Sequence, residues 1–361
     1  MAGKGSAKSY LLWTSYLLWT IIILQLISLM CFSGCTIITS VLEEGEEGKD
    51  KAFIANETNS FDTEAYFCPN DDCLTVLLSR IEDSASVKCA FYDLELELLI
   101  DALSEKKAEL VLDYSNYNDN IDTLTRVSEQ ATLGQKNRQM HNKFCVFEFG
   151  NGMTKAVATG SFNPTERGNQ NNNNNLVVVY SDYLAEDYLA EFKELKAGIH
   201  GRAGEATPYP KIILNNNLIE SYFCPEDCDG EDGIKIYTDL IDSAEGSVYF
   251  MTFSFTKDEI GDALVRAHER GIDVRGVFEK SQNNQYLEYQ RLADAGINVS
   301  WDINPANMHH KVFVIDRRTV ITGSANPTGN GLTTNDENII VLHDEAVADE
   351  FLEEFKRVLG S

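Results

Sequence analysis

Two short stretches of the chain carry the same reactive side chains in the same order. The first places His141 two residues before Lys143, and the second places His309 two residues before Lys311. A Gly-Ser-x-Asn segment follows each, beginning 19 residues after the first histidine and 14 after the second. Imidazoles can act as nucleophiles or general acids, and ammonium groups stabilise charge on a phosphate. The pattern therefore predicts chemistry at phosphorus.

The two copies together supply enough donors for one phosphate group. Alternation along a strand puts the histidine and the lysine of each copy on the same side. Two facing strands would then present two imidazoles, two ammonium groups and two amides, with serine hydroxyls as further donors. The side chains expected to perform catalysis are His141, Lys143, Asn163, His309, Lys311 and Asn326. One histidine would attack phosphorus while the other protonates the leaving oxygen, so we expect neither a metal nor a cofactor.

Six further side chains are expected to support this set. They are Ser161, Ser324, Asn174, Glu337, Glu148 and Asp316. Asn174 and Glu337 each lie eleven residues past a motif asparagine. If each contacts the histidine of its own copy, the carboxylate raises the pKa of His309 and suits it to proton donation. For Glu148 and Asp316, hydrogen bonds to turn amides are the more typical use.

The reactive stretches lie in the C-terminal part of each half of an internal repeat. Tyr66-Phe67-Cys68-Pro69 returns as Tyr222-Phe223-Cys224-Pro225, and in both halves helical and β-rich stretches follow in the same order. Strands that alternate with helices favour an α/β fold. We expect two similar α/β lobes about a pseudo-two-fold axis, with the active site between them. The predicted boundaries are 61–200 for the first lobe (motif 141–165) and 215–361 for the second (motif 309–328).

The chain begins with a segment typical of export. Lys4 and Lys8 precede an apolar run, residues 10–30, that is long enough to span a bilayer. The run ends in Phe-Ser-Gly-Cys35, which is similar to a lipoprotein cleavage box. We expect residues 1–35 to be a transmembrane or signal segment, which is retained, lipidated at Cys35 or cleaved. Residues 36–60 would form an acidic linker, with the body anchored to the cell membrane outside the cytoplasm.

Cysteine spacing agrees with an oxidising compartment. Two pairs are closely spaced, Cys68 with Cys73 and Cys224 with Cys228. They predict local disulfides. A zinc site is the alternative, but it would need histidine or cysteine partners nearby, and none is evident. Two further cysteines, at positions 89 and 145, are either paired or buried.

The charge of the chain bears on its substrate. Asp and Glu number 57 against 30 Lys and Arg, which gives a net charge of −27 at pH 7. Such a surface repels polyanions at long range. This counts against non-specific nucleic-acid binding as the main role.

The paired His-x-Lys-x4-Asp/Glu and Gly-Ser-x-Asn motifs resemble those of the phospholipase D superfamily, over residues 61–361. The resemblance implies metal-independent hydrolysis of phosphodiesters, or transfer to an alcohol, through a phosphohistidine intermediate. It also implies that the first-copy histidine, His141, is the nucleophile.

Phospholipid head groups are the favoured substrate, because of the predicted export, tether and acidic surface. An extracytoplasmic endonuclease of the same superfamily is the alternative. Its basic channel would come from Lys136, Arg138, Arg167, Arg317 and Arg318. An inactive surface-binding module and a lipid synthase or transferase are further alternatives. The expected partners are a phosphodiester substrate and the membrane, with no obligate protein partner.

Overall fold

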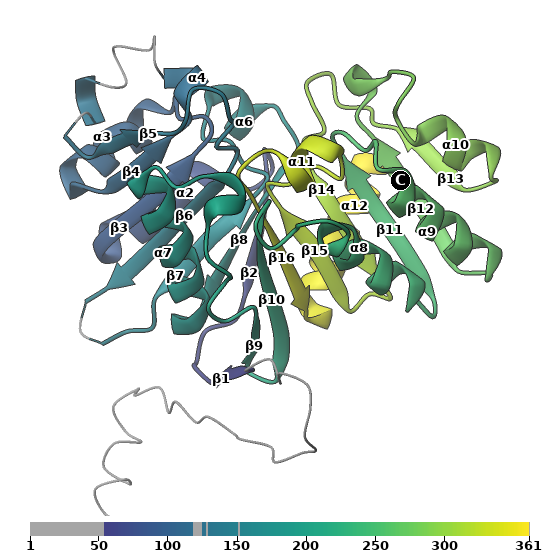
Figure 1. Cartoon of the computed structure of the whole chain (residues 1–361), viewed down its shortest axis with the longest axis horizontal. Coiled ribbons are helices and arrows are strands. Elements are labelled where there is room, and N and C mark those ends of the chain that lie inside the picture. Colours follow the sequence, from purple (N-terminus) through teal and green to yellow (C-terminus); the bar gives the residue numbers. More distant parts are fainter. Residues whose placement is uncertain (1–53, 118–124, 128, 151, 361) are drawn as a thin grey trace, which may run out of the picture.

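The computed structural model describes residues 54–117, 125–127, 129–150 and 152–360 (Figure 1). The predicted signal or transmembrane segment, residues 1–35, lies outside these residues, as does most of the predicted linker. Among the described residues, no helix combines the length and the apolar composition needed to cross a membrane.

The first lobe is built on a seven-stranded mixed sheet with the order β2-β8-β7-β6-β3-β4-β5. Strands β3, β4 and β5 pair in parallel, and the other neighbours are antiparallel. The strands are β2 (Glu64–Cys68), β3 (Ser84–Phe91), β4 (Glu109–Leu112), β5 (Ala131–Leu133), β6 (Lys143–Phe149), β7 (Ala156–Gly160) and β8 (Asn174–Tyr180).

The second lobe repeats this order as β10-β16-β15-β14-β11-β12-β13, and β9 and β1 extend its sheet at one edge. The duplicated mixed α/β arrangement predicted from the sequence is therefore confirmed. The strands are β1 (Ala55–Glu57), β9 (Lys211–Leu214), β10 (Asn217–Cys224), β11 (Ser247–Thr252), β12 (Asp273–Phe278), β13 (Asn298–Trp301), β14 (Lys311–Ile315), β15 (Thr319–Gly323) and β16 (Glu337–His343).

Helices cover both sheets, and the longest helix of each lobe has the same kind of ends. Ser181 and Asp344 cap the first turns of α7 and α12, and left-handed glycines, Gly198 and Gly360, end them. The helices are α2 (Cys73–Asp83), α3 (Glu97–Lys106), α4 (Tyr114–Tyr117), α6 (Glu166–Gln170), α7 (Asp182–Ala197), α8 (Asp232–Asp242), α9 (Asp258–Glu269), α10 (Tyr289–Asp294), α11 (Gly329–Thr333) and α12 (Glu345–Leu359), with 3-10 turns η1 (Gly201–Ala203) and η2 (Lys280–Gln282).

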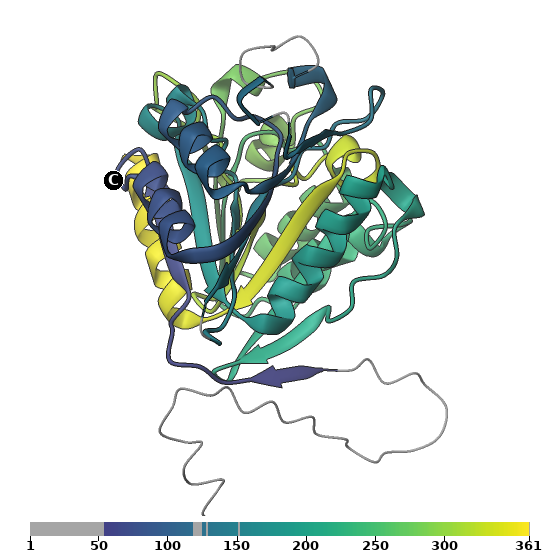
Figure 2. The ribbon, with the colours of Figure 1, turned by 90° about the vertical axis from the view of Figure 1, so that its left-hand side faces the viewer.

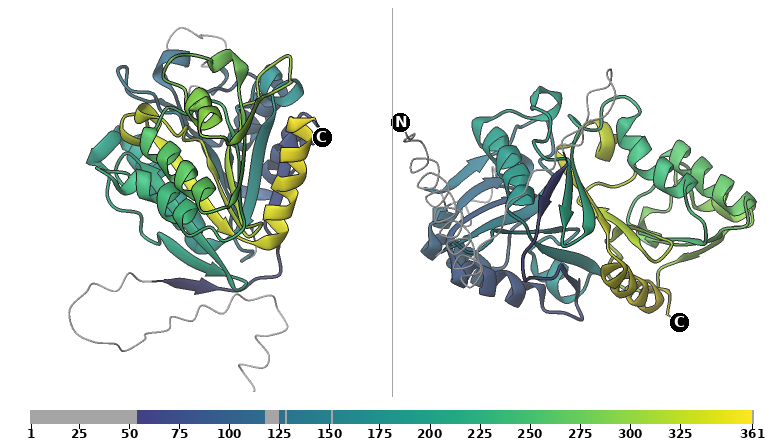
Figure 3. Two further views of the ribbon diagram at one scale, coloured as in Figure 1. Left: turned by 90° about the vertical axis from the view of Figure 1, so that its right-hand side faces the viewer. Right: turned by 90° about the horizontal axis from the view of Figure 1, so that it is seen from below.

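The two long helices join the lobes into one body, because each packs partly on the other lobe. Helix α12 lies along β2 of the first lobe (Figures 2 and 3), and α7 contacts β10 of the second. Phe351 of α12 meets Phe67 edge-on with ring centroids 4.9 Å apart, and Tyr188 of α7 meets Phe223 at 5.0 Å. Each such buried aromatic side chain contributes about 1.5–3 kcal/mol of hydrophobic free energy. One core therefore fixes the relative position of the lobes.

The last residues of the predicted linker belong to the fold, so the linker prediction is wrong at this end. Strand β1 pairs in parallel with β9. Glu57 is only 1% exposed, and its carboxylate accepts hydrogen bonds from the amides of Asp182 and Tyr183, each at 3.2 Å. These amides belong to the first turn of α7 and lack partners within the helix, which favours an acidic side chain there.

Three disulfides link the described cysteines. Two are the predicted local pairs, Cys68–Cys73 and Cys224–Cys228. The third joins Cys89 of β3 to Cys145 of β6, which face each other across neighbouring strands. The matching position of the second lobe holds Phe250 and Phe313, whose rings stack with centroids 5.5 Å apart. A covalent link in one lobe thus replaces an aromatic contact in the other.

Candidate active site

The two His-x-Lys stretches meet where the lobes join. Lys143 opens β6 and Lys311 opens β14, and each motif histidine lies two residues earlier. Two isolated β-bridges connect the lobes beside these residues. One joins residues 140 and 336, and the other joins residues 173 and 308. The histidines are 8–9% exposed and both lysines are 2% exposed. The topology therefore gathers all four side chains in one largely buried place.

Each motif histidine is held by a residue of the other lobe. Nδ1 of His141 lies 2.7 Å from Oε2 of Glu337, and Nδ1 of His309 lies 2.9 Å from Oδ1 of Asn174. The prediction that each pairs with the histidine of its own copy is therefore wrong. The reason is topological: β8 and β16 both begin at the junction, and their first residues point across it. Because these oxygens accept, each Nδ1 carries the proton and each Nε2 is left for chemistry.

Burial dominates the protonation of both imidazoles. It lowers the pKa of His141, which the carboxylate of Glu337 partly offsets and the charge of Lys143 reinforces. It lowers the pKa of His309 further, because Lys311, Lys143 and His141 all add positive charge nearby, and Nδ1 of His309 meets the neutral amide of Asn174 where His141 has a carboxylate. The predicted rise in the pKa of His309 is therefore also wrong. His141 is the histidine with an anionic partner.

Both lysines lie in matching contacts. Nζ of Lys143 donates to the carbonyl of His141, and Nζ of Lys311 donates to the carbonyl of His309 at 2.9 Å. Burial lowers the pKa of Lys143 to about 7 and that of Lys311 well below its ordinary value. An anionic phosphate bound between them would raise both values, since opposite charge favours the protonated form. The lysines are thus arranged to become fully charged when substrate binds.

An aromatic pair that sequence reasoning missed flanks this centre. Nζ of Lys143 lies 4.9 Å from the ring centroid of Tyr92, and Nζ of Lys311 lies 5.1 Å from that of Phe253. The same rings meet His141 and His309 edge-on at 4.7 and 4.8 Å. The available signal was their equivalent place at the ends of the two matching apolar stretches, 87–92 and 248–253.

The motif serines orient the residues that hold the histidines. The hydroxyl of Ser324 donates to Oε2 of Glu337 at 2.6 Å, and that of Ser161 lies 3.3 Å from Oδ1 of Asn174. We expected these hydroxyls to donate to substrate as well, but here both are buried in support of the histidine partners.

The preceding glycines are required by close backbone contact. Gly160 and Gly323 have φ values of 150° and 134°, and an added Cβ would lie 2.4 and 2.3 Å from carbonyl oxygens of residues 175 and 338. Only glycine allows this approach of the strands that position the motif.

The motif asparagines are placed differently from the serines. Asn163 and Asn326 are partly exposed, and within the described part of the chain their side-chain oxygens have no hydrogen-bond partner. A phosphate would be bound by the amide nitrogen, Nδ2, of each side chain, and this role as donors stays a prediction.

The remaining predicted residues lie away from the centre. Asp316 accepts from the amides of residues 245–247 at 2.7–2.9 Å, as expected for a structural acceptor. Glu148 instead forms an ion pair with Lys88 at 2.8 Å. Arg317 and Arg318 pair with Asp349 and with residue 345 of α12, at the opposite end of β14 from Lys311. They cannot line a channel beside the histidines.

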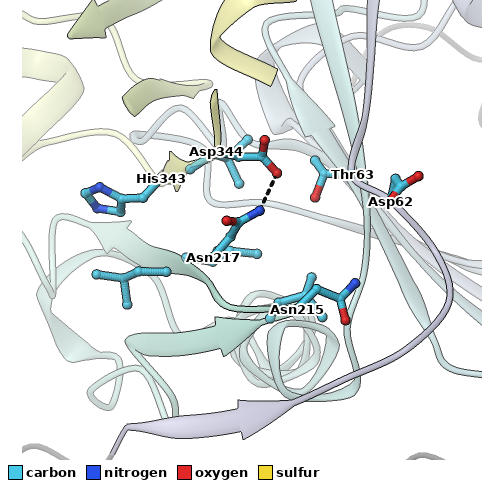
Figure 4. Close-up of a pocket in the computed structure, with 10 residues that line it drawn as sticks. Asp62, Thr63, Asn215, Asn217, His343 and Asp344 are labelled. Carbon is cyan, nitrogen blue, oxygen red and sulfur yellow. Dashed lines mark hydrogen bonds between the residues drawn. The ribbon is translucent and has the colours of Figure 1, made fainter. Parts of the chain in front are cut away.

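A pocket at the far end of β16 is separate from this site (Figure 4). His343 and Asp344 line it, and Asp344 accepts a hydrogen bond from Asn217 at 2.6 Å. Because Glu337 opens the same strand, the pocket lies roughly 20 Å from the histidines. It has no geometric link to the site chemistry.

One acidic group among the described residues has the spacing of a metal site. Carboxylate oxygens of Glu191, Glu194 and Glu226 lie within 4.8 Å of one another. Asn142, between the first histidine and lysine, donates to Glu191 at 3.2 Å. No other observation among the described residues points to a cation there, and burial raises the pKa values of Glu191 and Glu226, so the group holds protons instead.

Comparison with known proteins agrees with this geometry. A family model described as "Cardiolipin synthase, PLD-like domain" matches residues 84–196 and again residues 237–359. The chain belongs to the phospholipase D superfamily. The double match also corresponds to the duplication seen in the two sheets.

Among curated superfamily members, the chain is 32% identical over 185 residues to the phospholipase D of Rickettsia bellii, covering 49% of this chain and 84% of that protein. It is 26% identical over 193 residues to the mitochondrial cardiolipin hydrolase of Chlamydomonas reinhardtii, covering 48% and 86%. The predicted enzyme class, a phospholipase D-type phosphodiesterase, is confirmed.

One solved structure has a similar fold over most of the chain. The phosphatidylserine synthase of Haemophilus influenzae aligns with a TM-score of 0.59 over 81% of this chain and 86% of that one. Its sequence identity is 12%, so this similarity concerns the fold alone.

Proposed function

We propose that the protein hydrolyses phospholipid head groups through a phosphohistidine on His141, outside the cytoplasm and tethered by its N-terminal segment. The crossed pairing of His141 with Glu337 carries the mechanism. A carboxylate on Nδ1 keeps the lone pair of Nε2 available and stabilises the cationic phosphoimidazole that forms. His309, held by a neutral amide, takes up a proton on Nε2 when the anionic phosphate binds and raises its pKa, and it then gives this proton to the leaving oxygen.

The reaction has two displacements. Nε2 of His141 forms a bond to phosphorus as the bond to the leaving alcohol breaks, and a proton from Nε2 of His309 passes to that alcohol. Water then attacks phosphorus as the phosphorus–nitrogen bond breaks, and its proton returns to His309. Lys143, Lys311 and the motif asparagines stabilise the non-bridging oxygens in both steps. No metal or cofactor takes part in this scheme.

Charge around the site favours a small zwitterionic or anionic head group over a polyanion. Burial, with the nearby charge of Glu95, raises the pKa of Asp93 to about 6 even though Lys143 opposes this. At neutral pH Asp93 is still mostly ionised, so it and Glu95 place negative charge beside the site, where the second lobe has Ser254 and Thr256. The nuclease alternative needs a basic channel, and two of its five proposed residues, Arg317 and Arg318, lie at the other end of the sheet.

The test compares substrates on the full chain in detergent with EDTA. Mixed phospholipid vesicles and single- and double-stranded DNA are incubated in parallel with wild type, His141→Ala and the control His343→Ala. Head-group release that only His141→Ala abolishes supports the proposal. DNA cleavage without lipid turnover would overturn the choice of substrate. Inactivity on both substrates would contradict the proposed lipid substrate, while the membership of the superfamily would stand.

The location is tested separately. The full chain, expressed with its N-terminal segment, should fractionate with membranes and be accessible to protease from the outside. Recovery of the protein in the cytoplasmic fraction would contradict the proposed tether.

A further inference from the structure

The connection between the lobes holds a histidine that the proposed mechanism does not use. His200 lies three residues after the end of α7, and its side chain is 1% exposed. Nδ1 of His200 lies 2.6 Å from Oδ2 of Asp336, and the amide of Gly201 donates to the other oxygen of that carboxylate at 2.8 Å. The side chain of Asp336 is therefore held from two adjacent residues of the connection.

Asp336 reaches the site through its backbone. Its carbonyl accepts from the amide of His141 at 2.9 Å, and its own amide donates to the carbonyl of Gln139 at 2.9 Å. The next residue is Glu337, which holds Nδ1 of His141. A shift of Asp336 would therefore disturb both the backbone and the side-chain contact that orient the same imidazole.

The matching bridge at the other histidine is built without a charged group. The amide of His309 donates to the carbonyl of Asn173 at 2.8 Å, and Oδ1 of Asn173 accepts from Asn304 at 2.6 Å. Asn173 is the equivalent of Asp336, because each precedes the residue that holds a motif histidine. The histidine–carboxylate support thus belongs to one half of the site alone.

We propose that His200 is a positioning residue for the His141–Glu337 pair and acts through Asp336. Its Nε2 is buried and has no hydrogen-bond partner within the described residues. The polar contact of His200 with the site is therefore the one that Nδ1 makes with Asp336. The other charged groups around the carboxylate are Arg138, 4.0 Å from Oδ1, and the acids Glu191 and Glu226, whose pKa values Asp336 helps to raise. The catalytic consequence rests on the proposed function, whereas the orientation of His141 does not.

The first measurement needs no substrate. The pKa of the His141 imidazole is followed by NMR titration in wild type, His200→Ala and His200→Asn, after thermal melts show that each variant is folded. His200→Ala should lower the pKa of His141, as Glu337→Gln should, because the carboxylate that raises it is no longer held in place. Asparagine keeps a donor near the position of Nδ1 and should restore most of the wild-type value.

Two control variants distinguish a specific effect on the orientation of His141 from a general loss of packing. Asn304→Ala weakens the equivalent bridge at His309 and should leave the pKa of His141 unchanged. His343→Ala removes another histidine–carboxylate contact, 3.0 Å to Glu220, at the far end of β16, and should change neither titration nor rate. An unchanged pKa of His141 in folded His200→Ala would overturn the proposal.

Kinetics on a 4-nitrophenyl phosphodiester, a probe of any phosphodiesterase, give the second test. His200→Ala should lower kcat about 10- to 100-fold with little change in KM, the effect typical of lost outer support. In a Glu337→Gln background it should cost clearly less, because the charged contact it supports is gone and only the backbone contact between Asp336 and His141 remains to be disturbed. An equal loss in both backgrounds would assign His200 a merely structural role. If wild type hydrolyses no phosphodiester, the proposed function fails, and the titration still decides the position of His141.

Discussion

Nδ1 of His141 lies 2.7 Å from Oε2 of Glu337, a residue 196 positions later in the chain and in the other lobe. This contact, with its counterpart between His309 and Asn174, makes the site a joint product of both lobes. It also makes the site asymmetric, since of the two motif imidazoles in the described structure His141 is paired with a carboxylate and His309 with a neutral amide.

Glu337→Gln should lower kcat about 10- to 100-fold, because the phosphoimidazole loses its stabilising charge. The carboxylate raises the pKa of His141 against burial, so its loss lowers that pKa further. Neutral His141 would then persist to lower pH, and the acidic limb of kcat/KM should move downward. A pH–rate profile measures both effects. Ser324→Ala, which removes a hydroxyl that holds Glu337, should give a smaller change in the same direction; a full rate and an unmoved limb in Glu337→Gln would argue against this role.

His309→Asn should trap the covalent intermediate. A 4-nitrophenyl leaving group needs no proton donor, so the first displacement proceeds, but without His309 no base activates water. We expect a burst of about one nitrophenolate per enzyme followed by slow turnover, and mass spectrometry should place the phosphate on the peptide containing His141. Absence of a burst, or modification of another residue, would contradict the assignment of the nucleophile.

The aromatic pair should act through its rings. Tyr92→Phe should keep activity within about twofold, because the second lobe already uses Phe253 at the equivalent place. Tyr92→Leu removes the ring above Lys143, a contact worth about 1–2 kcal/mol when desolvated, and should lower kcat/KM roughly tenfold. Steady-state kinetics of the two variants separate ring from hydroxyl, and equal losses in both would show that the hydroxyl matters instead.

The disulfides should differ in their contribution to stability. Chain entropy predicts a loss of about 4 kcal/mol for Cys89→Ala/Cys145→Ala, whose link spans a long loop, and about 2 kcal/mol for the short Cys68–Cys73 link. Urea unfolding of each double variant gives the free energy of unfolding. A larger loss from the short loop would show that local geometry, rather than loop closure, dominates.

Glu226→Gln should stabilise the protein above mildly acidic pH. Burial raises the pKa of Glu226, and the nearby acids reinforce it, so the folded state holds a proton that the unfolded state releases above its ordinary value of 4.5. The free energy of unfolding therefore decreases as pH rises from the unfolded-state pKa of Glu226 to its raised folded-state pKa. Glutamine does not titrate, so the variant should not show this decrease. The expected gain is of order 1–3 kcal/mol near pH 8. Thermal melts from pH 5 to 9 measure it; equal pH dependence in both proteins would contradict the prediction.

Much of the site could be predicted from the sequence because its elements are local and repeated. The spacing of His141 and Lys143, and its return at His309 and Lys311, follows from strand alternation, which sequence patterns report directly. The duplicated α/β order follows for the same reason. His310 also behaves as alternation requires, since it points away from the site and pairs with Glu354 at 2.9 Å.

The partners of those residues depended on how the lobes pack, which no local pattern encodes. Because of strand pairing, Glu337 contacts His141 rather than His309. The same packing places the rings of Tyr92 and Phe253 over the lysines. It also brings His200 into contact with Asp336. Tertiary packing also explains why Glu57, which we predicted to lie in the linker, is hydrogen-bonded to the first turn of α7. Residue type and period are local properties, so the amino-acid sequence alone indicates which groups are reactive and that two halves supply them. Which group contacts which depends on residues far apart in the chain, and those contacts exist only in the folded protein.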